Sequence, residues 1–229
     1  MTIYHPLSAE EAVKLRHDHE NSLYLAGGTE ILRLGSDERD VDVLIDISNL
    51  SLSGITEKSG RVEIGAMTTL EEIRESELVP QFIRDAAAFC ASLQIRNRAT
   101  IGGNFALRRT DSYLVPALLA AEAEVKLMCN KGEKTKSVAE YFEKKECKGL
   151  LLSFSIEADR KGCVRRIARS SHAHAAVTGS LSESVYAYAV SSSGIAYGSK
   201  DSWKDINYVS DLTGSAEYKR YLASVLFEE

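Results

Sequence analysis

Two pairs of adjacent glycines constrain how this chain can fold. The first lies in YLAGGTEIL, Tyr24 to Leu32, directly after a short apolar run, and the second lies in ATIGGNFAL, Ala99 to Leu107. A tight turn with positive φ would explain either pair, because glycine adopts that backbone at little steric cost. An anion nest would also explain it, since bare N–H groups can approach phosphate oxygens that a Cβ would hold off.

The two pairs carry more information together than separately. Thr29 and Glu30 follow the first pair, while Thr100 precedes the second pair and Asn104 follows it. Two such segments could grip the two ends of one extended ligand. Neither contains Lys and neither fits G-x-G-x-x-G, which argues against a Walker A loop and a Rossmann site. We therefore expect a diphosphate held mainly by backbone amides.

Composition narrows the possible ligands and compartments. The 229 residues are 44% hydrophobic and 27% charged, as is typical of a globular protein. A net charge of -5 gives no general attraction to nucleic acid or to an anionic membrane. The N-terminus lacks the layout of a signal peptide, and no apolar stretch approaches the roughly 18 residues of a membrane span. We expect a cytoplasmic protein with no nucleic-acid or membrane partner.

The sequence gives little indication of a metal site or of an acid–base pair. The four cysteines form no C-x-x-C pair, and we interpret them as buried or idle thiols; they are Cys90, Cys129, Cys147 and Cys163. His172 and His174 would share one face of a strand, but no further ligand lies nearby at suitable spacing, so we predict no metal. Asp42 and Asp46 flank an apolar run and are expected to be strand-end acids rather than an acid–base pair with Glu30.

Periodicity and capping residues predict three successive α+β units: 1–52, 53–163 and 164–229. The first unit is expected to contain strands at 3–5, 23–25 and 41–47 and a helix from the Ser8 capping box to about His19. The strand at 41–47 is apolar throughout and is predicted to lie inside a sheet.

The second and third units are predicted from the same patterns. In the second, we expect a hairpin at 55–66 turning at Ser59-Gly60, a helix capped by Thr69, a helix through 82–89, a helix starting near 113–115, and strands at 124–129 and 149–156 around a short helix at 139–142. In the third, we expect strands around 167, 175–181 and 185–190 and a closing helix at 217–227.

Four motifs in order along the chain carry a family resemblance: AGGTEIL, IGAMTTLEEI, RNRATIGGNFALRRTDSYLVPALLAAEAEV and GSAEYKRYLASVL. Together they resemble the FAD-binding subunit of molybdenum hydroxylases, the family that includes the flavin subunits of xanthine dehydrogenase and carbon monoxide dehydrogenase. The chain is most similar to a short bacterial branch of that family. The resemblance implies a flavin fold of the vanillyl-alcohol-oxidase type, with two α+β subdomains and a small, shortened C-terminal α+β domain.

The resemblance also implies which residues bind FAD. A first loop would hold the pyrophosphate, a second loop would hold the other side of the cofactor, Ser112 would contact it, and Leu151 or Leu150 would lie against the isoalloxazine ring. Arg166 takes the place of a family lysine near the ring. The implied loop residues are Leu25, Ala26, Gly27, Gly28, Thr29 and Glu30 in the first loop and Ile95, Thr100, Gly102, Gly103 and Asn104 in the second.

The chain departs from the family at one of these contacts. The family often has Ser-Asp before the proline, whereas Tyr113 follows Ser112 here and Asp111 precedes it. That departure bears on the ribose or adenine end of the site. Four arginines surround the second glycine pair, and they are either a solvated basic face or part of a cofactor or partner site: Arg96, Arg98, Arg108 and Arg109.

The predicted activity follows from the implied cofactor and from what the chain lacks. No cluster-binding cysteines, nicotinamide fingerprint or catalytic acid or base are evident. We therefore expect an oxidoreductase subunit without catalytic residues of its own, which relays electrons through FAD between an iron–sulfur subunit and NAD or another acceptor, while a molybdopterin subunit oxidises the substrate. A stand-alone flavin oxidoreductase and a flavin-free scaffold protein remain the alternatives.

Overall fold

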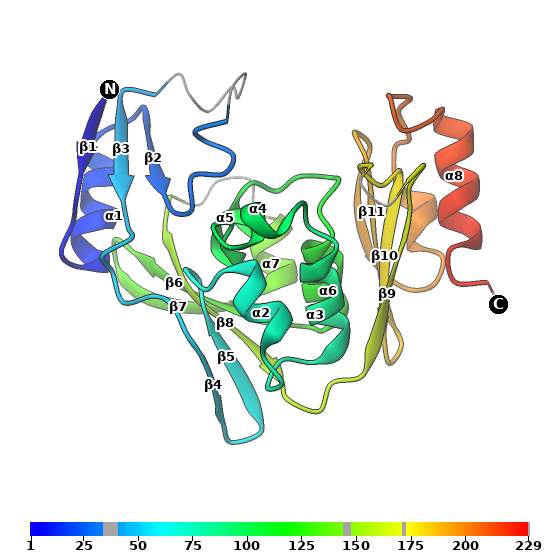
Figure 1. Cartoon of the computed structure of the whole chain (residues 1–229), viewed down its shortest axis with the longest axis horizontal. Coiled ribbons are helices and arrows are strands. Elements are labelled where there is room, and N and C mark those ends of the chain that lie inside the picture. The colour runs from blue at the N-terminus through cyan, green and yellow to red at the C-terminus, as the bar shows by residue number, and fades with distance from the viewer. Residues whose placement is uncertain (34–40, 144–147, 171–172, 229) are drawn as a thin grey trace.

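A computed structural model describes residues 1–33, 41–143, 148–170 and 173–228. It contains three sheets that follow one another along the long axis of the molecule, each with helices packed against it (Figure 1). The mixture of helices and strands is the α+β class that the sequence predicts. Among the described residues, none of the helices combines the length and apolar character needed to cross a membrane.

The first sheet is parallel and has the order β1-β3-β2. Its elements are β1 (Thr2–Tyr4), α1 (Ala9–Asp18), β2 (Ser22–Leu25) and β3 (Val43–Asp46). The central position of β3, whose first three residues are buried, confirms the prediction from its apolar run. Ser8 caps α1 by accepting from the Glu11 amide, whereas Glu11 Oε2 accepts from the amide of Leu7 rather than of Ser8.

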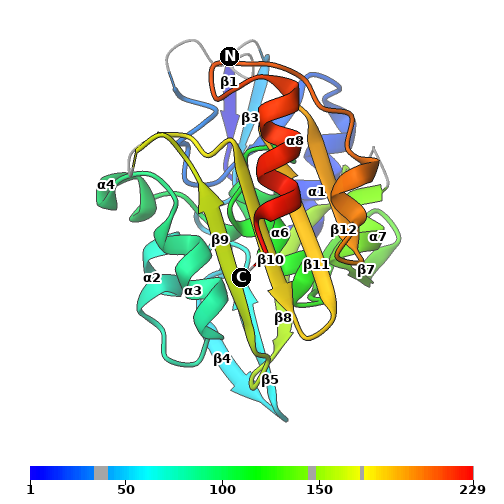
Figure 2. The same ribbon diagram turned by 90° about the vertical axis from the view of Figure 1, so that its right-hand side faces the viewer.

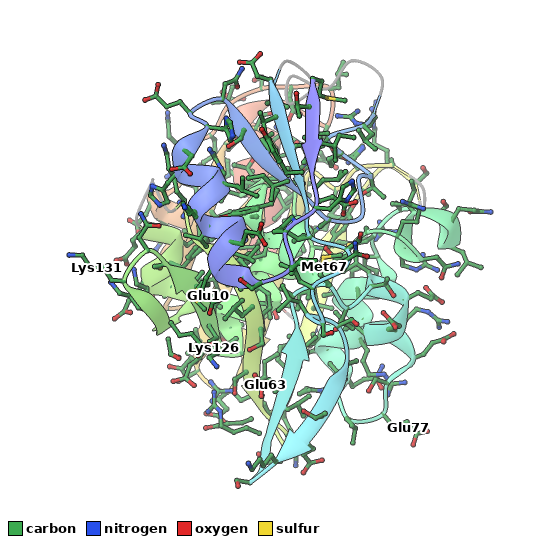
Figure 3. All side chains as sticks on the ribbon, turned by 90° about the vertical axis from the view of Figure 1, so that its left-hand side faces the viewer. Glu10, Glu63, Met67, Glu77, Lys126 and Lys131 are labelled. Atoms are coloured by element: carbon green, nitrogen blue, oxygen red, sulfur yellow. The ribbon has the colours of Figure 1, made fainter. Side chains whose placement is uncertain are left out.

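The second sheet is antiparallel and has the order β4-β5-β8-β6-β7. Its strands are β4 (Ile55–Lys58), β5 (Arg61–Gly65), β6 (Glu124–Cys129), β7 (Gly132–Ser137) and β8 (Leu150–Glu157). Ser59 and Gly60 form the hairpin turn with φ of 53° and 74°, as predicted. The view in Figure 3 shows this sheet below the first one, with Met67 between the first sheet and the β4–β5 hairpin.

Helices cover this second sheet and fill the centre of the molecule. They are α2 (Leu70–Glu75), α3 (Gln81–Ala88), α4 (Leu93–Arg96), α5 (Ile101–Ala106), α6 (Leu114–Ala120) and α7 (Val138–Glu143). The capping box at Thr69 is complete, and Pro116 lies in the first turn of α6, where its missing N–H does no harm. Phe82, Phe105 and Phe154 are fully buried in the largest core.

The third sheet is antiparallel and has the order β12-β11-β10-β9. Its strands are β9 (Gly162–Ile167), β10 (Val177–Ser182), β11 (Val185–Val190) and β12 (Gly194–Gly198), and a 3-10 helix, η2 (Ser202–Asp205), follows. Helix α8 (Ala216–Val225) packs on its outer face (Figure 2), and α6 packs on the inner face. The sheet is thus enclosed by helices on both sides.

Five elements differ from expectation. The second glycine pair lies in helix α5 and not in a loop, and helix α4, the polar strand β7, the short strand β12 and the 3-10 helix η2 were not predicted. The unit boundaries at 52/53 and 163/164 stay predictions. The chain passes from the first sheet to the second between β3 and β4, and from the second to the third between β8 and β9, which starts at Gly162.

Candidate functional site

A cavity of about 470 Å³ lies where the first sheet faces the central helices. In Figure 1, the segment after β2 faces α4 and α5, and both glycine pairs line the cavity between these elements. Twelve of the fourteen predicted site residues line it: Ala26, Gly27, Gly28, Thr29, Glu30, Ile95, Thr100, Gly102, Gly103, Asn104, Ser112 and Leu151. Leu150, the alternative ring contact, lines it too.

The first glycine segment lines this cavity and has unpaired backbone amides. Strand β2 ends at Leu25, whose carbonyl still accepts from the amide of Ile47, and Gly28 then adopts a φ of 71°. Within the described part of the chain, the amides of residues 27–30 donate to no protein acceptor. Successive unpaired N–H groups around a residue of positive φ form the concave dipole array that binds phosphate oxygens. The first segment thus has the unpaired amides that an anion site requires, and binding of an anion there stays a prediction.

Gly27 has a different role, because it lies directly against the second glycine segment. A Cβ on Gly27 would lie 1.8 Å from the carbonyl oxygen of Arg98. The Arg98 side chain also reaches back, and its Nε lies 3.4 Å from the Gly27 carbonyl oxygen. The two glycine segments, about seventy residues apart in sequence, therefore touch through their backbones.

The second glycine pair does not form an anion nest, which corrects the expectation from its sequence. The Gly102 amide donates to the Ala66 carbonyl at 2.9 Å, and the Gly103 amide donates to Thr100 Oγ1 at 3.1 Å. The flanking amides of Ile101 and Asn104 are also used by the protein. Thr100 is the N-cap of α5, and a Cβ on Gly102 would lie 2.8 Å from the Ala66 carbonyl oxygen. This pair serves close packing rather than donation to a ligand.

Two predicted residues, Leu25 and Arg166, are not in the cavity lining. The Arg166 guanidinium carbon lies 4.9 Å from the ring centroid of Phe89 and 5.5 Å from that of Tyr113. Tyr113 lines the cavity itself, and its hydroxyl accepts from the Ala175 amide at 3.3 Å. Arg166 therefore stacks on two aromatic rings, an arrangement that stabilises a cation.

Ser112 and Asn104 form one small polar group on the cavity wall. The Ser112 hydroxyl lies 3.1 Å from Asn104 Oδ1 and accepts from the Val115 amide at 3.1 Å. That second bond caps the start of α6, so the serine has a structural role as well as a place in the site. Contact of these residues with FAD stays a prediction.

Sequence reasoning missed several residues of the lining. Met67, Tyr141 and Cys90 all contribute to it. Burial raises the pKa of the Cys90 thiol to about 12, so this cysteine is a neutral apolar group at physiological pH. An isolated methionine, tyrosine or cysteine in an apolar run carries no local mark of a binding site, which is why these were missed.

The four arginines around the second glycine pair each contact other parts of the protein, although Arg98 is exposed. Arg96 forms an ion pair at 2.6 Å with Glu71, whose side chain is 9% exposed. Hydrogen bonds from Arg74 and Arg96 outweigh burial and lower the pKa of Glu71. Arg108 donates to the carbonyls of residues 141 and 142 and stacks on the Tyr141 ring. Arg96 and Arg108 are therefore used by the protein's own packing, whereas Arg98 remains at the surface.

Arg109 is the arginine that joins the two glycine segments through side chains. It forms a bidentate pair with Asp111, at 2.8 Å for both bonds, and its Nη1 lies 3.1 Å from Glu30 Oε2. His174 Nδ1 approaches Asp111 at 3.4 Å. Burial alone would raise the pKa of Asp111, but the hydrogen bond and charge of Arg109 bring it below its usual value. We call Glu30, Arg109 and Asp111 the clasp.

The other polar candidates have structural roles. Asp46 accepts from the Ser48 amide at 2.9 Å and Asp42 lies 3.3 Å from the Asn21 side chain, as expected of strand-end acids. His172 lies outside the described residues, as does Cys147. Among the residues described, no group of three or more His, Cys, Asp or Glu side chains is arranged to hold a metal ion.

The cavity is suitable for a dinucleotide such as FAD. Its volume lies in the range of roughly 300–1,000 Å³ that is usual for ligand sites. The lining includes residues 27–30, whose unpaired amides suit a diphosphate, and the apolar residues Leu150 and Leu151. These observations fit FAD and assign no individual contact.

Comparison with known proteins identifies the family. Residues 1–156 match the family described as FAD binding domain in molybdopterin dehydrogenase. The chain is 30% identical over 243 residues to the uncharacterized protein YgfM of Escherichia coli (strain K12), covering 97% of this chain and 92% of that protein. It is also 30% identical to the nicotinate dehydrogenase FAD-subunit of Eubacterium barkeri over 145 residues, which span 60% of this chain and 49% of that subunit.

Two solved structures have the same fold. Quinoline 2-oxidoreductase from Pseudomonas putida 86 superposes with a TM-score of 0.85 and 18% identity, over 99% of this chain and 93% of that one. Carbon monoxide dehydrogenase from Hydrogenophaga pseudoflava superposes with a TM-score of 0.86 and 20% identity, over 98% and 93%. These likenesses confirm the predicted fold, and the family match confirms the predicted cofactor class, FAD. The chain belongs to the family of FAD-binding domains of molybdopterin dehydrogenases.

Proposed function

We propose that this chain is the FAD-binding electron-transfer subunit of a multi-subunit molybdopterin-dependent hydroxylase or dehydrogenase. The observation that carries the proposal is a single cavity lined by both glycine segments, in a chain of an FAD-binding family. Relatives named as FAD subunits of nicotinate and xanthine dehydrogenases support the assignment to a larger complex. In that complex, the chain passes electrons between an iron–sulfur subunit and NAD or another acceptor.

The chemistry of the cavity wall favours electron relay over substrate turnover. Bound FAD would supply the capacity to take up and release one or two electrons. The two carboxylates of the described lining, Glu30 and Asp111, are both held by Arg109, and burial keeps the Cys90 thiol protonated. A stand-alone flavin enzyme needs an acid or base at its ring. The paired carboxylates are poorly suited to that role.

The proposed residue roles follow the geometry. The amides of residues 27–30 hold the diphosphate, and Leu151 or Leu150 lies against the isoalloxazine ring. Thr100, Gly103 and Asn104 line the same cavity from helix α5 and its N-cap. Arg166 stacks on Tyr113 and Phe89 outside the lining, so its charge acts on the isoalloxazine ring from beyond the cavity wall.

An absorption spectrum of the purified chain, with and without added FAD, tests the cofactor. We expect flavin bands that stay with the protein on gel filtration. A preparation that stays colourless after FAD is added would support the flavin-free scaffold and contradict the proposal.

Electron relay is tested in the assembled complex. When the chain is purified together with its molybdopterin and iron–sulfur partners, the substrate of the complex should bleach the flavin bands under anaerobic conditions, and NAD or another acceptor should restore them. Turnover of a small substrate by the FAD-loaded chain alone would instead favour a stand-alone oxidoreductase.

A further inference from the structure

The clasp places two carboxylates beside an array of amides that is suited to an anion. Glu30 lies in the row of unpaired amides, and Asp111 lies in the same cavity lining. Both side chains are largely shielded from solvent, with 29% and 16% of their surface exposed. Partly buried like charges repel more strongly than charges in water, so two uncompensated carboxylates would oppose diphosphate binding here.

Arg109 is the group that compensates them. Its Nε and Nη2 donate to the two oxygens of Asp111, and its Nη1 donates to Glu30. Arg33 reaches the same Glu30 oxygen at 3.2 Å, but its side chain is 55% exposed, so solvent weakens that pair. Glu30 follows β2, while Arg109 and Asp111 lie between α5 and α6, so the clasp also ties together two chain segments 79 residues apart.

We propose that Arg109 is a positioning residue for the diphosphate of FAD: it fixes the amide segment 27–30 through Glu30 and neutralises Glu30 and Asp111. The inference rests on the proposed function, in which those amides bind the diphosphate. Arg109 thus controls affinity without serving as a phosphate ligand. The alternative is that Arg109 binds the phosphate directly, and the two roles make different predictions for Glu30.

A double-mutant cycle separates these roles. Binding of FAD, and of ADP as a flavin-free diphosphate, is measured by calorimetry for the wild-type chain, R109Q, E30Q and R109Q/E30Q. R109Q should bind both ligands about tenfold or more weakly, because two carboxylates lose their cation. E30Q should change binding by less than about threefold, because Gln keeps an acceptor oxygen for Arg109.

The double variant decides between the two roles. If Arg109 acts through Glu30, then E30Q should restore at least about threefold of the affinity that R109Q loses, so the two effects are not additive. If Arg109 binds phosphate independently of Glu30, then E30Q will have the same effect in both backgrounds, and the proposal is overturned. Unchanged affinity in R109Q overturns it as well.

Matched controls address folding and the proposed function separately. Arg61 has the same side-chain exposure as Arg109, 38%, and a comparable ion pair at 2.9 Å with Glu124, but it is not in the cavity lining. R61Q should leave both affinities unchanged. R109K keeps the charge without the bidentate geometry and should bind both ligands with an affinity between those of the wild-type chain and R109Q. It replaces R109Q in the test if R109Q does not fold. If the wild-type chain binds ADP but not FAD, the proposed function is refuted, and the double-mutant cycle can still be measured with ADP.

Discussion

The two glycine segments look alike in sequence but use their glycines for different physical purposes. In the first, Gly28 adopts positive φ, and the amides of residues 27–30, which line the cavity, have no protein partner in the described chain. In the second, the glycines lie in the first turn of α5, and their amides donate to Ala66 and Thr100. A double glycine after an apolar run therefore indicates close backbone approach, but not whether that approach is to a ligand or to the protein.

The comparison also shows how one site is built from unlike halves. The second segment is a rigid wall, capped by Thr100 and packed through Gly102 on Ala66. The first segment rests on that wall through Gly27 and is joined to its far side by Arg109. The unpaired amide donors thus lie on the first segment, which has few internal hydrogen bonds. The second segment, whose amides are all bonded, supports it.

The largest expected effect comes from breaking the contact between the halves. In Gly27→Ala, the new Cβ would lie 1.8 Å from a backbone carbonyl, which no side-chain rotation can relieve. We expect a loss of about 3 kcal/mol in the free energy of unfolding, at the upper end for overpacking. Urea denaturation of the purified variant measures it.

Gly194→Ala is the matched control for Gly27→Ala. An added Cβ there meets only a side-chain carbon of Ile206, at 3.7 Å. Its unfolding free energy should stay close to the wild-type value. Equal stability of the two variants would show that the segments do not touch as described.

The second-largest expected effect distinguishes the first glycine segment, whose amides are unpaired, from the second, whose amides are bonded within the protein. Gly28→Asp places a carboxylate among the free amides and should lower FAD affinity on the order of a hundredfold, about 2.7 kcal/mol. Gly103→Asp adds charge to a wall that donates no amide, so we expect a loss of about tenfold. Titration of each variant with FAD, followed by flavin fluorescence, measures both.

Gly60→Asp controls for the backbone strain that Gly28→Asp introduces at a residue of positive φ. Gly60 has a φ of 74°, close to the 71° of Gly28, and nothing lies within 4 Å of an added Cβ. It should lose stability comparably to Gly28→Asp but retain FAD. If Gly103→Asp proved more harmful to binding than Gly28→Asp, the assignment of donor and wall would have to be reversed.

Local patterns predicted most of the fold because their causes are local. The caps at Ser8 and Thr69, the Ser59-Gly60 turn and the buried run of β3 each depend on residues a few positions apart. Helix α5 was missed because the bonds that complete it come from distant carbonyls at Ala66 and Thr68.

The site was predicted less completely for the same reason. The family resemblance located twelve residues of the lining, but the clasp joins residues 79 positions apart, and no periodicity or spacing indicates such a pair. The polar strand β7 forms because β6 offers it a pairing edge, although its own residues, GEKTKS, have little preference for strand structure.

The smallest expected effect tests the short polar residues that accompany each glycine pair. Thr100 Oγ1 caps α5 by accepting from the Gly103 amide, so Thr100→Ala should lower the unfolding free energy by about 1 kcal/mol. Thr29 forms no side-chain hydrogen bond with the described residues, so Thr29→Ala should leave stability unchanged within about 0.5 kcal/mol. Thermal unfolding of the FAD-free chains compares them. Equal losses at the two threonines would mean that the first segment is held by its own side chains, and its amides would then have to be regarded as part of a closed turn rather than as donors awaiting a ligand.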